Sequence, residues 1–265
     1  MAVDPAYLAF AVEAAIAAGR IHREHFRLQP AVRKKGPIDL VTAADLASEA
    51  DFRARVAAAF PDHAVLGEEA LGPAPAASAR CRWIIDPLDG TTNFAHGLAL
   101  FSVSIAFEVS GQIELGVVYD PMAGELFTGE RGGGARLNGQ IIHVSDRGAL
   151  VDGLLCTGFP YSIREHRLRQ VEVFAAFLER ARAVRRLGSA ALDLCYVAAG
   201  RFDGFWEEQL HPWDMAAAGL IVREAGGRVT DYETGPLNLY TGGPIVASNG
   251  RLHDLMVGVI REARG

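Results

Sequence analysis

The sequence has few cysteines, and no two of them have the spacing of a pair. Its three cysteines, Cys81, Cys156 and Cys195, each stand in an apolar setting. A disulfide framework needs an even and regularly spaced set. These residues are better explained as small core residues of a protein kept in a reducing compartment.

Long apolar runs are also missing. No stretch approaches the ~20 residues that a membrane-spanning helix needs. The alanine-rich N-terminus contains Asp4 and Pro5, which form a typical helix start, and Glu13 interrupts the apolar residues that follow. No small-residue cleavage site comes after them, so this segment predicts an amphipathic helix and not a signal peptide. We therefore expect a soluble, cytoplasmic protein.

An excess of positive charge is absent as well. The net charge of −6 argues against nucleic acid as the main partner. The arginines of residues 164–186 are interleaved with glutamates and lack an aromatic pattern, which is typical of a solvated helix face. His22 and His25 have helical spacing, but no third ligand stands nearby, so they do not indicate a zinc site.

The strongest signal is carried by residues 83–94, WIIDPLDGTTNF. Their apolar run predicts a short buried strand that delivers Asp86 to a turn containing Asp89 and Gly90. Two carboxylates in one small volume repel each other unless a proton or a cation lies between them. Oxygen ligands of this kind suit Mg²⁺, and a helix start directly after Gly90 suits phosphate. Taken alone, the pattern is equally consistent with a capped helix and two surface aspartates.

Other acidic residues stand where they can join this pair. A short apolar strand runs into Glu68, and if it is a parallel neighbour of the first strand, Glu68 and Asp86 meet at one sheet edge. Asp45 begins a helix for which Thr42 or Asp45 itself is the cap. Asp214 opens another helix. By themselves, Asp45 and Asp214 are explained by capping and by compensation of the helix dipole.

The pattern of elements changes near residue 145. Residues 1–145 predict an α+β half, in which a pair of helices precedes a meander of strands and residues 32–42 form an exposed, mobile loop. Residues 146–265 alternate strands with helices, which predicts an α/β half with a parallel or mixed sheet. There we expect strands at residues 150–159, 183–187, 202–206, 228–231 and 245–248, and helices at 162–180, 188–199 and 212–225, with a last helix after residue 249.

Several motifs follow one another in a fixed order, namely KGPIDLVTAAD, GEE, WIIDPLDGTTNF, GSAALDLCYVAAGRFDGFWE and WDMAAAGLIVREAGG. Over essentially the whole chain, the sequence resembles the inositol monophosphatase family. The resemblance implies a layered αβαβα sandwich of the sugar-phosphatase type with two tightly joined halves. It also implies a Mg²⁺-dependent, lithium-sensitive phosphomonoesterase that uses two or three ions and is commonly a homodimer.

The resemblance implies a role for each matching position of this chain. The metal ligands would be Glu68, Asp86, the carbonyl of Leu88, Asp89 and Asp214. Asp45 and Thr91 would orient and activate the attacking water, to which Glu68 would contribute through a weaker third ion. Gly90, Thr91 and Thr92 would bind the phosphate, Gly188, Ser189, Ala190 and Glu207 would contact the alcohol, and Lys34 would belong to the mobile loop.

The resulting hypothesis is direct hydrolysis of inositol 1-phosphate, a small phosphorylated polyol, without a phosphoenzyme. A cysteine-dependent phosphatase is disfavoured because Ser162 stands where Cys156 would need an arginine. Fructose-1,6-bisphosphatase and histidinol-phosphatase activities stay open, since the pockets differ by few side chains. A regulatory protein that binds the transcription machinery, with Arg185 and Arg186 on its surface, is an alternative of a different class.

Overall fold

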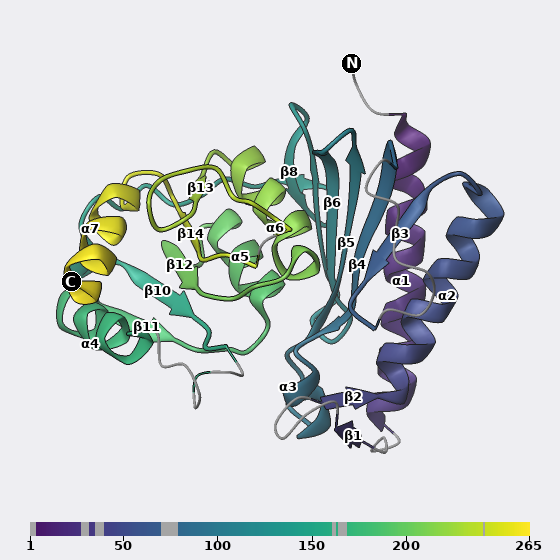
Figure 1. The fold of residues 1–265 in the computed structure, drawn as a ribbon, viewed down its shortest axis with the longest axis horizontal. Coiled ribbons are helices and arrows are strands. Elements are labelled where there is room, and N and C mark those ends of the chain that lie inside the picture. Colours follow the sequence, from purple (N-terminus) through teal and green to yellow (C-terminus); the bar gives the residue numbers. More distant parts are fainter. Residues whose placement is uncertain are drawn as a thin grey trace.

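The computed structural model describes residues 4–27, 32–34, 40–69, 79–160, 163, 169–240 and 242–265. These residues form five layers in the order helix, sheet, helix, sheet, helix (Figure 1). The predicted αβαβα layering is confirmed. The position of the boundary between the two halves stays a prediction.

The first layer consists of two long helices, α1 (Pro5–Arg27) and α2 (Ala43–Ala59). The predicted start of α1 is confirmed, because the carboxylate of Asp4 accepts a hydrogen bond from the backbone N–H of Ala6 at 2.9 Å. The cap of α2 is Thr42, whose Oγ1 accepts from the N–H of Ala44 at 3.1 Å. Helix α1 buries an alanine-rich face that lets it pack closely on the adjacent sheet, whereas α2 packs there with Phe52 and Val56.

The second layer is a seven-stranded sheet with the order β3-β4-β5-β6-β7-β8-β9. Strands β3 and β4 are parallel neighbours, and the other neighbouring pairs are antiparallel. Trp83, Ile85 and Phe107 face the first layer, whereas Ile84 and Ala106 face the third. The strands are β3 (Ala64–Gly67), β4 (Cys81–Asp89), β5 (Ser102–Val109), β6 (Gln112–Asp120), β7 (Glu125–Glu130), β8 (Gly134–Leu137) and β9 (Gln140–Ile141).

The turn predicted after Asp86 is wrong. Strand β4 continues to Asp89, and its pairing with β5 skips from Asp86 opposite Ser104 to Asp89 opposite Ser102. Proline and the irregular pairing make a bulge, which bends the strand without ending it. The chain turns only at Gly90, whose φ of 98° suits a glycine.

The prediction of an irregular loop at residues 32–42 is also wrong in part. Strands β1 (Val32–Lys34) and β2 (Leu40–Thr42) form a two-stranded antiparallel sheet. Local composition did not indicate this pairing, because two short strands are stabilised by each other and not by an apolar pattern of their own. Residues 35–39 and the side chain of Lys34 lie outside the described part of the chain.

The fourth layer is a five-stranded mixed sheet with the order β11-β10-β12-β14-β13. Strand β10 is parallel to β11 and β12, and the remaining pairs are antiparallel, so the predicted mixed sheet is confirmed. The strands are β10 (Leu154–Thr157), β11 (Ala183–Arg185), β12 (Gly204–Glu207), β13 (Arg228–Thr230) and β14 (Ile245–Ser248). The predicted strand at residues 150–159 is shorter in the structure, because Leu150–Asp152 is a 3₁₀ turn, η1.

Helices α5 (Ala190–Ala198) and α6 (Pro212–Glu224) fill the space between the two sheets. Gly116 of β6 permits this packing, since a Cβ there would lie 2.5 Å from the carbonyl oxygen of Ala217. Helices α4 (Gln170–Arg180) and α7 (His253–Arg264) form the outer layer. The predicted helix at residues 162–180 is confirmed from Gln170 onward, and most of its earlier part lies outside the described residues.

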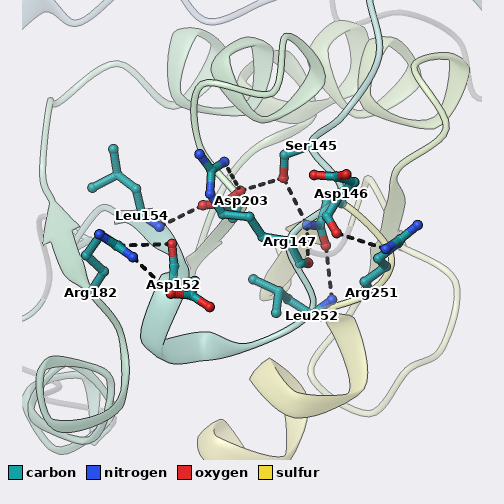
Figure 2. Close-up of polar contacts among 10 residues, drawn as sticks. Ser145, Asp146, Arg147, Asp152, Leu154, Arg182, Asp203, Arg251 and Leu252 are labelled. Carbon is teal, nitrogen blue, oxygen red and sulfur yellow. Dashed lines mark hydrogen bonds and ion pairs between the residues drawn. The ribbon is translucent and has the colours of Figure 1, made fainter.

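A buried carboxylate holds the connection between the halves in place (Figure 2). The carboxylate of Asp203 accepts hydrogen bonds from Ser145 Oγ at 2.5 Å, Arg147 Nη1 at 3.0 Å and the N–H of Leu154 at 2.7 Å. Asn249 Nδ2 donates in turn to Ser145 Oγ and to the carbonyl of Arg147. These hydrogen bonds connect the segment that leaves the first sheet to strand β10, which belongs to the second sheet.

Candidate active site

The two halves enclose a cavity of about 650 Å³ at the end of β4. Most of the predicted site residues line it, although they come from segments far apart in the chain. They are Glu68, Asp86, Leu88, Asp89, Gly90, Thr91, Gly188, Ser189, Ala190, Glu207 and Asp214. Asp45 lies directly behind this wall, and Thr92 is not among the lining residues. The structure thus brings together nearly all of the predicted set.

Asp86 lies in the bulge of β4 and is 2% exposed. One of its oxygens, Oδ1, accepts a hydrogen bond from the N–H of Leu88 at 2.9 Å. Burial raises the pKa of Asp86 well above its usual range, and the negative charges of Glu68, Asp89 and Asp214 raise it further. The four carboxylates are therefore close enough to interact electrostatically.

The parallel pairing of β3 with β4 places Glu68 beside Asp86. Gly67 stands opposite Ile85, and the N–H of Glu68 donates to the carbonyl of Ile85 at 3.3 Å. From the sequence we expected this meeting only if the two strands are parallel neighbours, and the pairing shows that they are. The side chain of Glu68 is half-buried and lines the cavity.

Asp89 joins the two halves of the molecule. Its carboxylate accepts from Ser189 Oγ at 2.5 Å and from the N–H groups of Ala190 and Ala191 at 3.2 Å and 2.9 Å. The residues predicted to contact the alcohol at the start of α5 therefore contact Asp89 in this structure. Burial raises the pKa of Asp89 in spite of these hydrogen bonds, which act in the opposite direction.

Asp214 is both a helix cap and a member of the acidic cluster. Its Oδ2 accepts from the N–H of His211 at 2.6 Å, in a capping box at the start of α6. Burial raises its pKa well above the usual range, and the charges of Asp89 and Glu68 add to this effect. Capping alone, the simpler explanation from sequence, does not account for a position beside these carboxylates.

Asp45 and Thr91 form a direct hydrogen bond, although they are far apart in the sequence. Thr91 Oγ1 lies 3.1 Å from Asp45 Oδ1 and 3.0 Å from the carbonyl oxygen of Leu88. The other oxygen of Asp45 accepts from Thr42 Oγ1 at 2.5 Å and from its N–H at 2.8 Å. Burial raises the pKa of Asp45. Thr91 thus connects a buried carboxyl group with the cavity wall.

This geometry can be compared with known proteins. A model of the inositol monophosphatase family matches residues 5–264. The chain belongs to the inositol monophosphatase family. The resemblance inferred from the ordered motifs is therefore confirmed.

Two curated relatives and one solved structure are similar over nearly the whole chain. Inositol-1-monophosphatase of Mesorhizobium japonicum is 46% identical over 240 residues, or 90% of each chain. Nus factor SuhB of Escherichia coli (strain K12) is 43% identical over 257 residues, or 96% of each chain. The extragenic suppressor protein suhB of Bartonella henselae has a TM-score of 0.91 at 41% identity, covering 97% of this chain and 99% of that one.

Membership of the inositol monophosphatase family supports phosphatase activity, and the donors in the cavity suit the family's Mg²⁺. Carboxylates and the carbonyl of Leu88 are the hard oxygen ligands that Mg²⁺ prefers. Among the described residues, no group of three or more Asp, Glu, His or Cys side chains is arranged so that it could hold a metal ion by itself. Mg²⁺ usually binds one or two carboxylates and completes its shell with water and substrate phosphate, so an open arrangement fits this ion.

The structure adds to the site two residues that the sequence analysis did not assign to it in this member of the inositol monophosphatase family. Asp193, one turn into α5, and Arg186 also line the cavity. Burial raises the pKa of Asp193 well above its usual range. Glu207 is 8% exposed, and its carboxylate lies so close to Gly158 that a Cβ there would collide with it. The only sequence signal for Asp193 was an acidic residue inside an otherwise apolar helix.

No helix among the described residues has both the length and the apolar character needed to cross a membrane.

Proposed function

We propose that this chain is a Mg²⁺-dependent phosphatase that hydrolyses inositol 1-phosphate to inositol and phosphate. The observation that carries the proposal is the acidic cluster of Asp86, Asp89 and Asp214 with Glu68. Among the described residues, no arginine or lysine forms an ion pair with Asp86, Asp89 or Asp214. Buried acids that raise one another's pKa are poised to bind a cation.

In this proposal the acidic residues would bind two Mg²⁺ ions. Glu68, Asp86 and the carbonyl of Leu88 would hold one Mg²⁺, and Asp86, Asp89 and Asp214 would hold a second. When bound, the ions would acidify water and neutralise the charge on the phosphate and on the departing alkoxide. Asp86 is the shared ligand. Its Oδ1 is oriented by the N–H of Leu88, which leaves its remaining lone pairs for the ions.

Asp45 and Thr91 would act on the attacking water. Thr91 lines the cavity and can accept a proton from water while its hydroxyl hydrogen bonds to Asp45. A carboxyl group with a raised pKa is a stronger base than an exposed one, so burial improves Asp45 for this task. Attack by water avoids any need for a nucleophilic side chain, and the buried thiols of Cys156 and Cys195 take no part.

The opposite side of the cavity would receive the rest of the substrate. Gly90, Thr91 and Thr92 would contact the phosphate group, and Gly188, Ser189, Ala190 and Glu207 would contact the alcohol. Burial raises the pKa of Glu207 well above its usual range, and the charges of Asp193 and Asp214 act in the same direction. A neutral, protonated Glu207 can both donate to and accept from polyol hydroxyls. Lys34 is assigned to the neighbouring loop from the resemblance alone.

The decisive experiment is phosphate release from a substrate panel, with Mg²⁺ titrated and lithium added. The panel holds inositol 1-phosphate, fructose 1,6-bisphosphate, histidinol phosphate and 3′-phosphoadenosine 5′-phosphate. Mg²⁺-dependent, lithium-inhibited preference for inositol 1-phosphate is the expected result. Preference for another substrate would retain the phosphatase chemistry and correct the substrate, and no release from any of them would contradict the proposal.

A regulatory binding role is the second candidate, because the Escherichia coli relative is named a Nus factor. The binding surface would include the exposed Arg185 and Arg186 at the end of β11. A Glu68→Ala protein that lacks phosphatase activity but retains RNA polymerase in a pull-down would support this role. Loss of the polymerase in an Arg185→Ala/Arg186→Ala variant would locate the surface.

A further inference from the structure

His22 lies on the buried face of α1 and contacts the backbone of the acidic segment. Its side chain is 0% exposed, and its ring meets Phe94 and Phe101 edge to face, with centroid distances of 6.4 Å and 5.9 Å. The Nε2 atom is 2.7 Å from the carbonyl oxygen of Pro87. Because a carbonyl can only accept, Nε2 carries the hydrogen and Nδ1 does not.

The carbonyl that His22 contacts lies where the pairing of β4 with β5 is irregular. The β4–β5 pairing skips from Asp86 to Asp89, so the bulge removes Pro87 and Leu88 from the ladder. A buried backbone carbonyl needs a hydrogen bond, and His22 donates one to the carbonyl of Pro87. Gly19, one turn earlier on α1, allows the helix to come this close to the sheet, since a Cβ there would lie 2.5 Å from Cε1 of Tyr119.

The peptide unit between Pro87 and Leu88 is therefore held at both ends. Its carbonyl accepts from His22, and its N–H donates to Asp86 Oδ1 at 2.9 Å. The oxygen of the next carbonyl, that of Leu88, lies 3.0 Å from Thr91 Oγ1. Rotation of this one peptide plane would turn both the carboxylate of Asp86 and the carbonyl of Leu88.

We propose that His22 is a positioning residue for the Mg²⁺ site. By fixing the peptide plane between Pro87 and Leu88, it orients the Asp86 carboxylate and the Leu88 carbonyl toward the cavity. The inference rests on the proposed function, because it concerns the ligands of that site. It also explains why a histidine, and not an apolar residue, packs against Phe94 and Phe101.

An ordinary core histidine would not explain the contacts equally well. Nδ1 is buried and has no hydrogen-bond partner among the described residues, which is an unfavourable arrangement. A leucine would fill the space between Phe94 and Phe101 without that cost. The histidine instead donates a hydrogen bond to the Pro87 carbonyl, which an apolar side chain could not do.

The test is Mg²⁺ binding measured by calorimetry without substrate, in wild type and in variants at position 22. His22→Leu removes the donor, and loss of such a supporting hydrogen bond is expected to weaken Mg²⁺ affinity by about 10- to 100-fold. His22→Gln should restore most of the affinity, because its Nε2 amide lies as many bonds from Cα as the histidine Nε2. His22→Asn should not, since its amide reaches only the position of Nδ1.

Arg23→Leu is the matched control. Arg23 follows His22 on α1 and donates from Nη1 to the carbonyl of Pro121 at 3.3 Å, away from the acidic cluster. This variant also loses a hydrogen bond from α1 to a strand-end carbonyl. It should bind Mg²⁺ with wild-type affinity, even if its melting temperature falls as much as that of His22→Leu.

The other outcomes of these measurements would contradict either the role of His22 or the proposed function. Wild-type Mg²⁺ affinity in His22→Leu, or equal weakening in Arg23→Leu, would overturn the role of His22 and leave the proposed function intact. If neither His22→Leu nor His22→Asn folds, His22 serves the core and not the metal site. A wild-type protein that binds no Mg²⁺ would overturn the proposed function together with this inference.

Discussion

The acidic cluster around Asp86 and the buried carboxylate of Asp203 have different surroundings. Asp203 accepts from an arginine, a serine hydroxyl and a backbone N–H, so its charge and its lone pairs are matched within the protein (Figure 2). Asp86 and Asp214 each accept one backbone N–H and face further carboxylates. Both sites are buried, and in the acidic cluster burial together with the neighbouring carboxylates raises the pKa values of Asp86 and Asp214.

The difference separates a structural acid from a functional one. A buried charge is stabilised when its partners are part of the fold, as at Asp203. The cluster around Asp86 keeps like charges together, which destabilises the ionised, cation-free protein and favours any cation that enters. Burial or hydrogen-bond counts alone would not distinguish these sites, whereas the sign of the neighbouring charges does.

The largest expected effect is on turnover. Asp86→Asn removes the shared ligand, and a loss of several kcal/mol of transition-state stabilisation should lower kcat by about 10³-fold or more. The measurement is phosphate release at saturating Mg²⁺, with circular dichroism to verify the fold. Asp214→Asn should behave in the same way. A kcat near that of wild type in either variant would contradict the ligand assignment.

At Asp203, the structural carboxylate, we expect a substitution to lower stability and to leave turnover unchanged. Asp203→Asn replaces one acceptor oxygen by an NH₂ group, which faces either the donors of Ser145 and Arg147 at Oδ1 or the N–H of Leu154 at Oδ2. Leaving a buried donor unpaired should lower the free energy of unfolding by about 1–3 kcal/mol. Urea denaturation measures this change. The kcat should stay at the wild-type level at temperatures well below the melting transition. A large loss of kcat in the folded variant would contradict a purely structural role of Asp203.

Glu207 tests how far the acidic cluster extends. Glu207→Ala should change the ratio of kcat/KM between inositol 1-phosphate and other substrates by about tenfold, because a polar contact to the alcohol is lost. The Mg²⁺ concentration that gives half-maximal activity should hardly move, since Glu207 is not among the proposed ligands. A large shift in Mg²⁺ dependence with unchanged substrate preference would assign Glu207 to the metal site instead.

The smallest effect concerns pH. The raised pKa values of Asp45, Asp86, Asp89 and Asp214 mean that the native protein keeps protons that the unfolded chain releases near pH ~4. Above that pH the native state binds more protons, so the free energy of unfolding should fall as pH rises.

Melting temperatures in EDTA should therefore decrease from about pH 5 to about pH 8, and Mg²⁺ should reverse the decrease. Asp86→Asn should flatten the profile, because one of the interacting acids is gone. An unchanged slope in Asp86→Asn would show that the pH dependence arises outside the acidic cluster. Asp203→Asn provides the comparison, since it leaves that cluster intact.

Much of the site could be predicted before the structure. The apolar runs that end in Glu68 and Asp86 indicated adjacent strands, and adjacent parallel strands bring their ends to one edge. The start of α6 at Pro212 and the cap at Thr42 followed from local signals that act over three or four residues. Family membership then followed from the order of the motifs.

Other features could not be predicted, because they depend on residues distant in the sequence. The bulge that carries β4 past Asp86 is defined by its pairing with β5. The contact of Asp89 with the start of α5 joins residues 100 to 102 positions apart. The hydrogen bond from His22 to Pro87 spans 65 positions and has no local signal.

The sequence by itself determined which chemistry this protein carries. The acids, hydroxyls and glycines of the ordered motifs are oxygen donors and turn residues wherever they lie in space, and local periodicity is enough to place them on strand ends and helix starts. Only the tertiary structure decided which of those acids face one another and which, like Asp203, are neutralised by the fold. Charge interactions depend on distance and burial, and these arise when remote segments pack together.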